Sequence, residues 1–150
     1  AVGLRLGAPV CSTHTCVCGS EADKNGQHAL VCNKLKSRHS RHSLGNNVIF
    51  RGLTAASFPS SLEPLGLFRN GDNKRPDGVT LVPWDHGKPL AWDLTVVHRL
   101  ASSYMNAAKR EGPTIADQAE SKKTAKYLEI AATHQMQPIA IETLGTTSLD

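Results

Sequence analysis

The sequence lacks long hydrophobic runs, since no stretch approaches the roughly 18 apolar residues of a membrane-spanning helix. We therefore expect no membrane segment. The amino terminus also lacks an initiator methionine and the apolar core of a signal peptide, and the last residues form no obvious closing element. From these absences we expect a fragment of a longer protein.

Cysteine is absent after Cys32, and aromatic residues are scarce. All four cysteines lie within residues 11–32, which disfavours a disulfide framework spread over the fold. Aromatic residues make up 5% of the chain and hydrophobic residues 39%, so we expect a modest, mostly aliphatic core. The 150 residues suit one domain with a small appendage, and the net charge of +4 is compatible with a polyanionic partner without requiring one.

The clustered cysteines form a candidate zinc site. Residues 16–32 read C-x-C-x9-H-x3-C, and the glycine after the first pair allows a tight turn whose backbone N–H groups face the thiolates. Four such side chains satisfy a closed tetrahedral zinc site, while a disulfide or free thiols are the alternative. We predict a structural zinc knuckle over residues 1–33 and the main domain over residues 34–150. The expected ligands are Cys16, Cys18, His28 and Cys32, with Cys11 and His14 as substitutes for one of them.

A helical pattern follows the knuckle, from Lys34 to about Ser57. Its first turns are strongly basic, which favours contact with nucleic-acid phosphates, although a solvated helix face explains the same charge equally well. His42 and Asn46 fall on the inner stripe of this helix, where we expect buried hydrogen bonds. The residues expected to contact nucleic acid are Lys34, Lys36, Arg38 and Arg41, together with Arg75 further along the chain.

Residues 75–97 contain two β-rich runs around a polar turn, which predicts an antiparallel hairpin. With the turn centred on Asp85, Asp77 lies opposite Asp93, and opposed side chains share a face at roughly 4.5–5.5 Å between Cβ atoms. Two carboxylates at that spacing repel each other unless a cation lies between them, and oxygen ligands suit Mg²⁺. The hairpin therefore predicts a divalent-metal site, with two unrelated surface aspartates as the alternative.

The last part of the chain predicts a long helix, from Thr114 to about His134, and a strand over residues 137–143 beside the hairpin. Lys123 interrupts the apolar ridge of this helix, so its ammonium must either reach solvent or pair with a carboxylate. The hairpin aspartates are the expected partners. The order of helix, extended piece, hairpin, helix and strand indicates an α/β fold in which helices cover a small mixed sheet.

Together these motifs resemble the carboxy-terminal region of non-LTR retrotransposon reverse transcriptases that carry a restriction-like endonuclease. In that family a CCHC knuckle precedes an Arg-His motif, a Pro-Asp pair, an acidic residue and a lysine-tyrosine motif, in that order. The resemblance covers residues 16–127. The matching positions are Cys16, Cys18, His28, Cys32, Arg41-His42, Arg75-Pro76-Asp77, Asp93, and Lys123 with Tyr127.

The resemblance implies a restriction-endonuclease-like PD-(D/E)XK fold and a Mg²⁺- or Mn²⁺-dependent endonuclease that nicks target DNA. It implies that Asp77 and Asp93 hold the catalytic metal with help from the carbonyl of Leu94, and that Lys123 acts on the attacking water. Glu63 would be the auxiliary acid of the fold's first helix, although the sequence predicts no helix there. The family further implies an upstream reverse transcriptase domain, contact with element RNA, and a nuclear location.

Three features depart from the family pattern. The second acid is Asp93 rather than glutamate, the gap that separates it from Asp77 is slightly longer than usual, and Thr95 stands where a lysine is common. In the retrotransposon enzymes that lysine is displaced to the following helix, which is where Lys123 is found. The alternatives are a nucleic-acid-binding module that has lost its chemistry and a zinc-stabilised protein-interaction domain.

Overall fold

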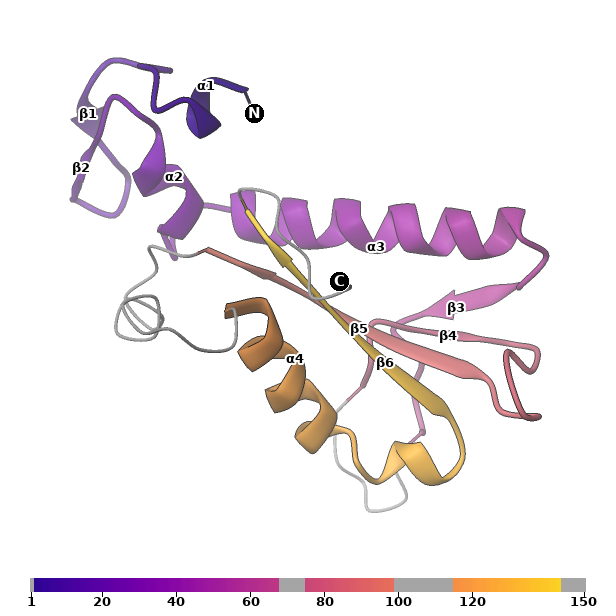
Figure 1. The fold of residues 1–150 in the computed structure, drawn as a ribbon. Helices are drawn as coiled ribbons and strands as arrows, with labels where there is room; N and C mark the ends of the chain where they lie inside the picture. Colours follow the sequence, from indigo (N-terminus) through magenta and orange to yellow (C-terminus); the bar gives the residue numbers. More distant parts are fainter. Residues whose placement is uncertain (1, 68–74, 99–114, 144–150) are drawn as a thin grey trace.

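The computed structural model describes residues 2–67, 75–98 and 115–143. Short elements at the amino terminus lead into one long helix, which runs across a sheet that carries a second helix (Figure 1). None of the helices in the described ranges is both long and apolar enough to span a bilayer. The elements in chain order are α1 (Val2–Arg5), β1 (His14–Thr15), β2 (Glu21–Ala22), α2 (Gln27–Val31), α3 (Ser37–Ala55), β3 (Ser60–Leu62), β4 (Gly78–Thr80), β5 (Leu90–Val97), α4 (Ile115–Lys126), the 3₁₀ turn η1 (Ile130–Ala132) and β6 (Gln135–Glu142).

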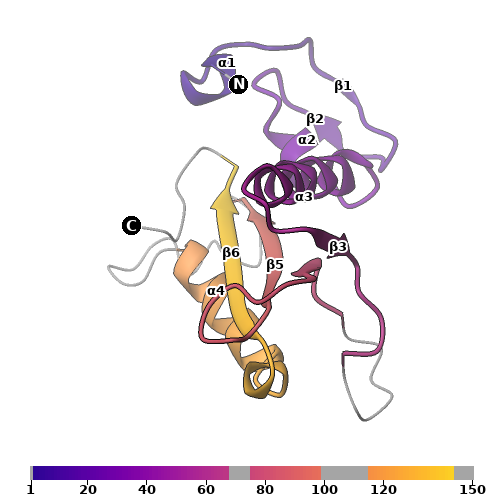
Figure 2. The same cartoon turned by 90° about the vertical axis from the view of Figure 1, so that its right-hand side faces the viewer.

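The main sheet has the strand order β3-β4-β5-β6 and is mixed. β3, β4 and β5 are antiparallel neighbours, whereas β6 runs parallel to β5 along its whole length. Figure 2 shows β5 and β6 side by side, with α3 across the sheet and α4 beside β6. The predicted α/β architecture, with helices flanking a small mixed sheet, is confirmed at this level.

The alternation of side chains along β5 divides the molecule into two layers. Leu94 lies against α3, since a Cβ placed on Gly45 would come within 2.5 Å of its Cδ2 atom. Val97 faces the opposite side, where it packs in one cluster with Ile115 and Ala119 of α4. Successive side chains of β5 therefore point toward α3 and toward α4 in alternation. The same alternation applies to Trp92, Asp93 and Leu94 at the centre of the strand.

The predicted pairing of the hairpin is confirmed, but the predicted turn is wrong. Gly78 pairs with Trp92 and Val79 with Ala91 in the β4–β5 ladder, as the predicted register requires. Asp77 departs from that register, since its backbone N–H donates to the carbonyl of Trp92. Its side chain bonds to α3 whereas that of Asp93 bonds to α4, so the expectation that the two aspartates share a face is wrong.

The reversal itself is centred on His86 and Gly87 rather than on Asp85. Both residues have positive φ, 47° and 74°, as a type I′ turn requires, and glycine adopts such an angle without strain.

Two element boundaries differ from the sequence prediction. The helix expected to reach His134 ends at Lys126, because the N–H of Tyr127 lies 3.1 Å from the carbonyl of Lys123 and 3.3 Å from that of Thr124, a tightened last turn. The expected start at Thr114 lies outside the described residues. The extended piece expected after Glu63 is preceded by β3, whose two serines gave no strand signal.

The close approach of Gly78 and Trp92 gives a stability prediction. A Cβ at Gly78 would lie 2.1 Å from Cζ2 of the Trp92 ring, so Gly78→Ala is expected to lower the free energy of unfolding by about 1–3 kcal/mol through overpacking. Gly52→Ala within α3 is the matched control, since no heavy atom lies within 4 Å and alanine should add about 0.5–1 kcal/mol. Urea unfolding measures both, and equal stability of the two variants would contradict the packing.

Candidate functional site

Asp77 lies at the point where β4 stops covering β5. Its backbone N–H donates to the carbonyl of Trp92 at 2.9 Å. Its Oδ2 atom accepts the N–H of Leu94 at 2.7 Å. Beyond the end of β4, the carboxylate thus serves as the hydrogen-bond acceptor that a neighbouring strand would otherwise supply. The local geometry of the sheet therefore holds the Asp77 side chain next to residues 93 and 94.

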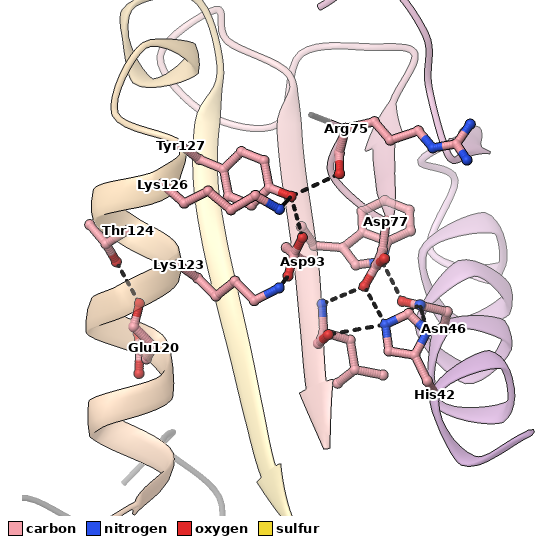
Figure 3. A network of polar contacts seen from close by, with 12 residues as sticks. His42, Asn46, Arg75, Asp77, Asp93, Glu120, Lys123, Thr124, Lys126 and Tyr127 are labelled. Carbon is pink, nitrogen blue, oxygen red and sulfur yellow. Dashed lines mark hydrogen bonds and ion pairs between the residues drawn. The ribbon is translucent and has the colours of Figure 1, made fainter. Parts of the chain in front are cut away.

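His42 reaches the same group from α3. Its Nε2 atom is 3.0 Å from Asp77 Oδ2 and 3.1 Å from the carbonyl oxygen of Leu94. The predicted hydrogen bonds of the inner stripe of α3 are found, but the side chain of His42 is 39% exposed, so the expected burial is confirmed only for Asn46. Asn46, one turn later, accepts the indole N–H of Trp92 at 3.1 Å. These contacts join α3 to the end of the hairpin (Figure 3).

Asp93 faces the other helix and is buried there, with 3% of its surface exposed. Its Oδ2 atom lies 2.5 Å from Nζ of Lys123, and its Oδ1 atom accepts the hydroxyl of Tyr127 at 2.5 Å. The expected pairing of Lys123 with a hairpin aspartate is therefore found at Asp93. Because the carboxylate has almost no access to water, the lysine supplies the charge that makes its burial tolerable.

Tyr127 fixes the orientation of the Asp93 carboxylate. Its hydroxyl oxygen accepts Nζ of Lys126 at 2.8 Å and lies 2.8 Å from the carbonyl of Arg75. Burial raises the pKa of Tyr127, as does its hydrogen bond to Asp93, so the phenol keeps its proton. The sequence places Tyr127 on the same helix ridge as Lys123, four residues earlier, and the family match pairs the two, but neither predicts the bond to Asp93.

The donor set suits a hard cation, which tests the expected Mg²⁺ or Mn²⁺. Asp77, Asp93 and the Leu94 carbonyl offer only oxygen ligands, as these ions prefer. Asp77 Oδ1 makes no hydrogen bond or ion pair within residues 2–67, 75–98 and 115–143, whereas the other oxygens already contact His42, Lys123 or Tyr127. Figure 3 shows Asp77 directed toward His42 of α3 and Asp93 directed toward Lys123 of α4.

The backbone N–H of Glu63, the expected auxiliary acid, donates to the carbonyl of Asp77 at 2.8 Å, but its side chain pairs with Arg75. Glu63 follows β3 with a φ of 46° and belongs to no helix, as the sequence indicated. Its Oε2 atom is 3.3 Å from Nη2 of Arg75, and both side chains are exposed. An ion pair in that setting contributes little to stability, and it turns Arg75 toward Glu63.

The basic residues expected to contact nucleic acid fall into two groups. Lys34, Lys36 and Arg38 are exposed at the start of α3. Arg41 is half-buried, and its Nη2 atom donates to the carbonyl of Leu30 at 2.9 Å, which ties α2 to α3. Burial lowers the pKa of Arg41. Arg41 thus has a contact inside the protein, whereas Lys34, Lys36 and Arg38 are exposed, with Arg38 Nη1 donating to Asn33 Oδ1 at 2.6 Å.

The four predicted zinc ligands come together, with one ligand atom from each within 4.8 Å of the others. The Sγ atoms of Cys16 and Cys32 are 3.8 Å apart, and Cys18 Sγ lies 3.3 Å from Nε2 of His28. A tetrahedron with Zn–S bonds of about 2.3 Å has S–S edges of about 3.8 Å. The group can therefore bind a metal such as zinc. Cys11 and His14, the substitutes, lie outside it and bond to the carbonyls of Asp23 and Ser12.

Hydrogen bonds from the loop after Cys18 favour the thiolate form of this cysteine, which is the form that binds a metal. The backbone N–H and hydroxyl of Ser20 lower the pKa of Cys18 to about 6, so its thiolate is populated at neutral pH.

Asp23 accepts the backbone N–H groups of His28 at 2.8 Å and Gln27 at 3.1 Å, which lowers the pKa of Asp23. This cap contributes fully to stability above the carboxyl pKa of the unfolded chain and is lost as the pH falls through the lowered value.

Comparison of the sequence with protein-family models and with curated proteins gives no match. The function must therefore be argued from the geometry of these two sites.

Proposed function

We propose that the chain is a metal-dependent DNA endonuclease with a restriction-endonuclease-like fold, of the kind that accompanies non-LTR retrotransposon reverse transcriptases. The observation that supports the proposal is the pairing of Lys123 with Asp93 at 2.5 Å, next to Leu94, whose backbone N–H donates to the carboxylate of Asp77 at 2.7 Å. The further expectations of the resemblance belong to the same proposal: an upstream polymerase domain, element RNA as a second partner, and a nuclear location.

The residues divide the work as follows. Asp77, Asp93 and the Leu94 carbonyl would hold Mg²⁺ or Mn²⁺, which polarises the scissile phosphate and lowers the pKa of a bound water. Lys123 would orient that water or stabilise the charge that develops on the phosphate. Tyr127 holds Asp93 so that one carboxylate oxygen faces the lysine.

The exposed cations at the start of α3 are suited to the DNA backbone. Lys34, Lys36 and Arg38 lie next to the metal-binding cysteine cluster, which fixes the amino terminus of α3 through the Arg41 contact to Leu30. Phosphate contacts of this kind supply affinity and register without reading sequence. The cluster would then be a structural zinc site that presents the basic turn to DNA.

One observation favours a second candidate, a nucleic-acid-binding module without catalysis. Both oxygens of Asp93 are bonded within the protein and its carboxylate is buried, as in a purely structural ion pair. Supercoiled plasmid incubated with the purified chain and Mg²⁺ or Mn²⁺ decides between the two. Metal-dependent conversion to open circles supports the nuclease. A salt-dependent mobility shift without nicking supports the module, and no shift at low salt would favour the protein-interaction domain.

Lys123→Ala is expected to lower the nicking rate by about 10²–10³-fold while the affinity for DNA stays the same, because the ammonium acts on the reacting groups. Lys122→Ala, an exposed neighbour on the same helix, is the matched control. Rates and mobility shifts are compared below the melting temperature of each variant, since Lys123 also balances a buried carboxylate. A parallel loss of DNA affinity would make Lys123 a phosphate contact instead.

A further inference from the structure

A chain of hydrogen bonds leads from the core to the Asp77 side of the site, and its first link has a fixed direction. The indole N–H of Trp92 can only donate, so the atom of Asn46 at 3.1 Å must be the amide oxygen. Both side chains are buried, Trp92 completely and Asn46 with 7% exposed. The amide nitrogen of Asn46 is thereby turned toward His42, its neighbour one turn earlier in α3.

The second link sets the tautomer of His42. Asn46 Nδ2 lies 3.4 Å from Nδ1 of the imidazole and 3.5 Å from Nε2. These two distances are nearly equal, so the choice between the ring nitrogens comes from the other contacts of Nε2. An amide nitrogen offers only protons, so the ring nitrogen that accepts from it carries none. Nε2 faces two acceptors, Asp77 Oδ2 at 3.0 Å and the Leu94 carbonyl at 3.1 Å, and therefore carries the proton.

The last link ends on two groups that the proposed nuclease needs. Asp77 Oδ2 and the Leu94 carbonyl oxygen are fixed by one imidazole N–H, and Oδ2 also accepts the N–H of Leu94. With Oδ2 bonded in this way, Oδ1 of Asp77 is left to approach a cation. Each link pairs one donor with one acceptor, so the direction of the chain is consistent from indole to carboxylate.

We propose that Trp92, Asn46 and His42 form a one-directional hydrogen-bond chain that positions Asp77 and the Leu94 carbonyl for a divalent cation. The hydrogen-bond chain does not depend on catalysis, whereas its role in positioning a cation rests on the proposed nuclease function. His42 and Asn46 are positioning residues here, since they act through Asp77 and Leu94. Outer contacts of this kind commonly change metal affinity or activity by about 10–100-fold.

Asn46→Asp tests the direction of the chain, because it keeps the acceptor for Trp92 and removes the donor for His42. Nδ1 of His42 is then expected to carry a proton that the new carboxylate accepts, while Nε2 keeps the proton that faces Asp77 and the Leu94 carbonyl. Asn47→Asp, exposed on the same helix, adds the same charge without touching the chain. The readout is the pair of imidazole ¹⁵N shifts of His42 in the zinc-loaded chain, assigned by their loss in His42→Gln.

Wild type and Asn47→Asp should both show a single Nε2–H tautomer, and Asn46→Asp should show a protonated Nδ1. A wild-type proton on Nδ1, or an unchanged pattern in Asn46→Asp, overturns the chain. If Asn46→Asp does not fold, Asn46→Ala is measured instead. It removes the donor to Nδ1 while Nε2 keeps its two acceptors, so the Nε2–H tautomer should persist with a changed Nδ1 shift, and an unchanged Nδ1 shift overturns the chain.

The positioning role is tested with Mn²⁺ alone, through paramagnetic broadening of the His42 and Leu94 signals. Half-saturation is expected to need about 10–100-fold more Mn²⁺ in Asn46→Ala than in the matched Asn47→Ala. Equal values, or no broadening in the wild type, overturn the role. Neither readout depends on nicking. If the protein binds Mn²⁺ in the expected way but leaves plasmid intact, the proposed nuclease function is wrong and the positioning role of the hydrogen-bond chain still holds.

Discussion

Asp77→Asn is expected to lower the metal-dependent nicking rate by at least about 10²–10³-fold, the loss that follows removal of one preorganised charge-stabilising group. Asparagine keeps the shape of the side chain, and its oxygen can still accept the N–H of Leu94 and the proton of His42. It cannot supply an anionic oxygen to the cation. The expected loss is therefore in the chemical step, with folding and DNA affinity close to those of the wild type.

Asp85→Asn is the matched control for this result. Asp85 lies at the hairpin tip, where its carboxylate is half-exposed and 3.5 Å from His86, so the same change of charge falls on the same hairpin outside the site. Plasmid conversion is followed over time for both variants at equal protein and metal concentrations. If Asp77→Asn nicks as fast as Asp85→Asn, the assignment of Asp77 to the active site is wrong.

Removal of zinc is expected to unfold residues 11–45 first and to leave the sheet largely intact. The elements there are very short, β1 and β2 having two residues each and α2 five. Their buried cluster consists of Cys16, Ala22 and Cys32, with Cys18 and Leu35 packed against it, so three of the four ligands are also its core. Structural zinc supplies an apparent binding free energy of about 10–16 kcal/mol in small zinc domains, far more than this cluster can.

Hydrogen exchange before and after chelation measures the effect segment by segment, and metal analysis should find one zinc per chain. Cys32→Ser should reproduce the loss of protection. Cys11→Ser should not, because Cys11 is exposed and lies outside the ligand group. If hydrogen exchange over residues 11–45 is unchanged in the zinc-free protein, the predicted zinc knuckle is wrong.

The sequence predicted the parts of the fold that depend on local patterns. The β-rich runs around residues 85–88 produced the hairpin and its register, and the apolar run at the end of the chain produced β6. The lysine that interrupts an apolar ridge led correctly to Asp93, since an ammonium on a buried face requires a counter-charge. Cysteine and histidine spacing identified all four members of the metal-binding group.

The sequence does not predict the contacts of α3, because they depend on how that helix crosses the sheet. His42 was expected to make hydrogen bonds, but its partners Asp77 and Leu94 are set by the crossing alone. The basic neighbours of Arg41 predicted a phosphate contact, whereas its side chain donates to the carbonyl of Leu30. The end of α4 was missed because apolar residues continue past Lys126 into the 3₁₀ turn.

The parallel pairing of β5 with β6 has a consequence for the order in which the molecule folds. β4 and β5 are joined by a short turn and can associate early, whereas β5 from residue 90 pairs with β6 from residue 135, so a long loop must close first. We therefore expect β4 and β5 to pair before Lys123 and Tyr127 reach Asp93. Until α4 docks, the carboxylate of Asp93 lacks the ammonium that pairs with it in the folded protein.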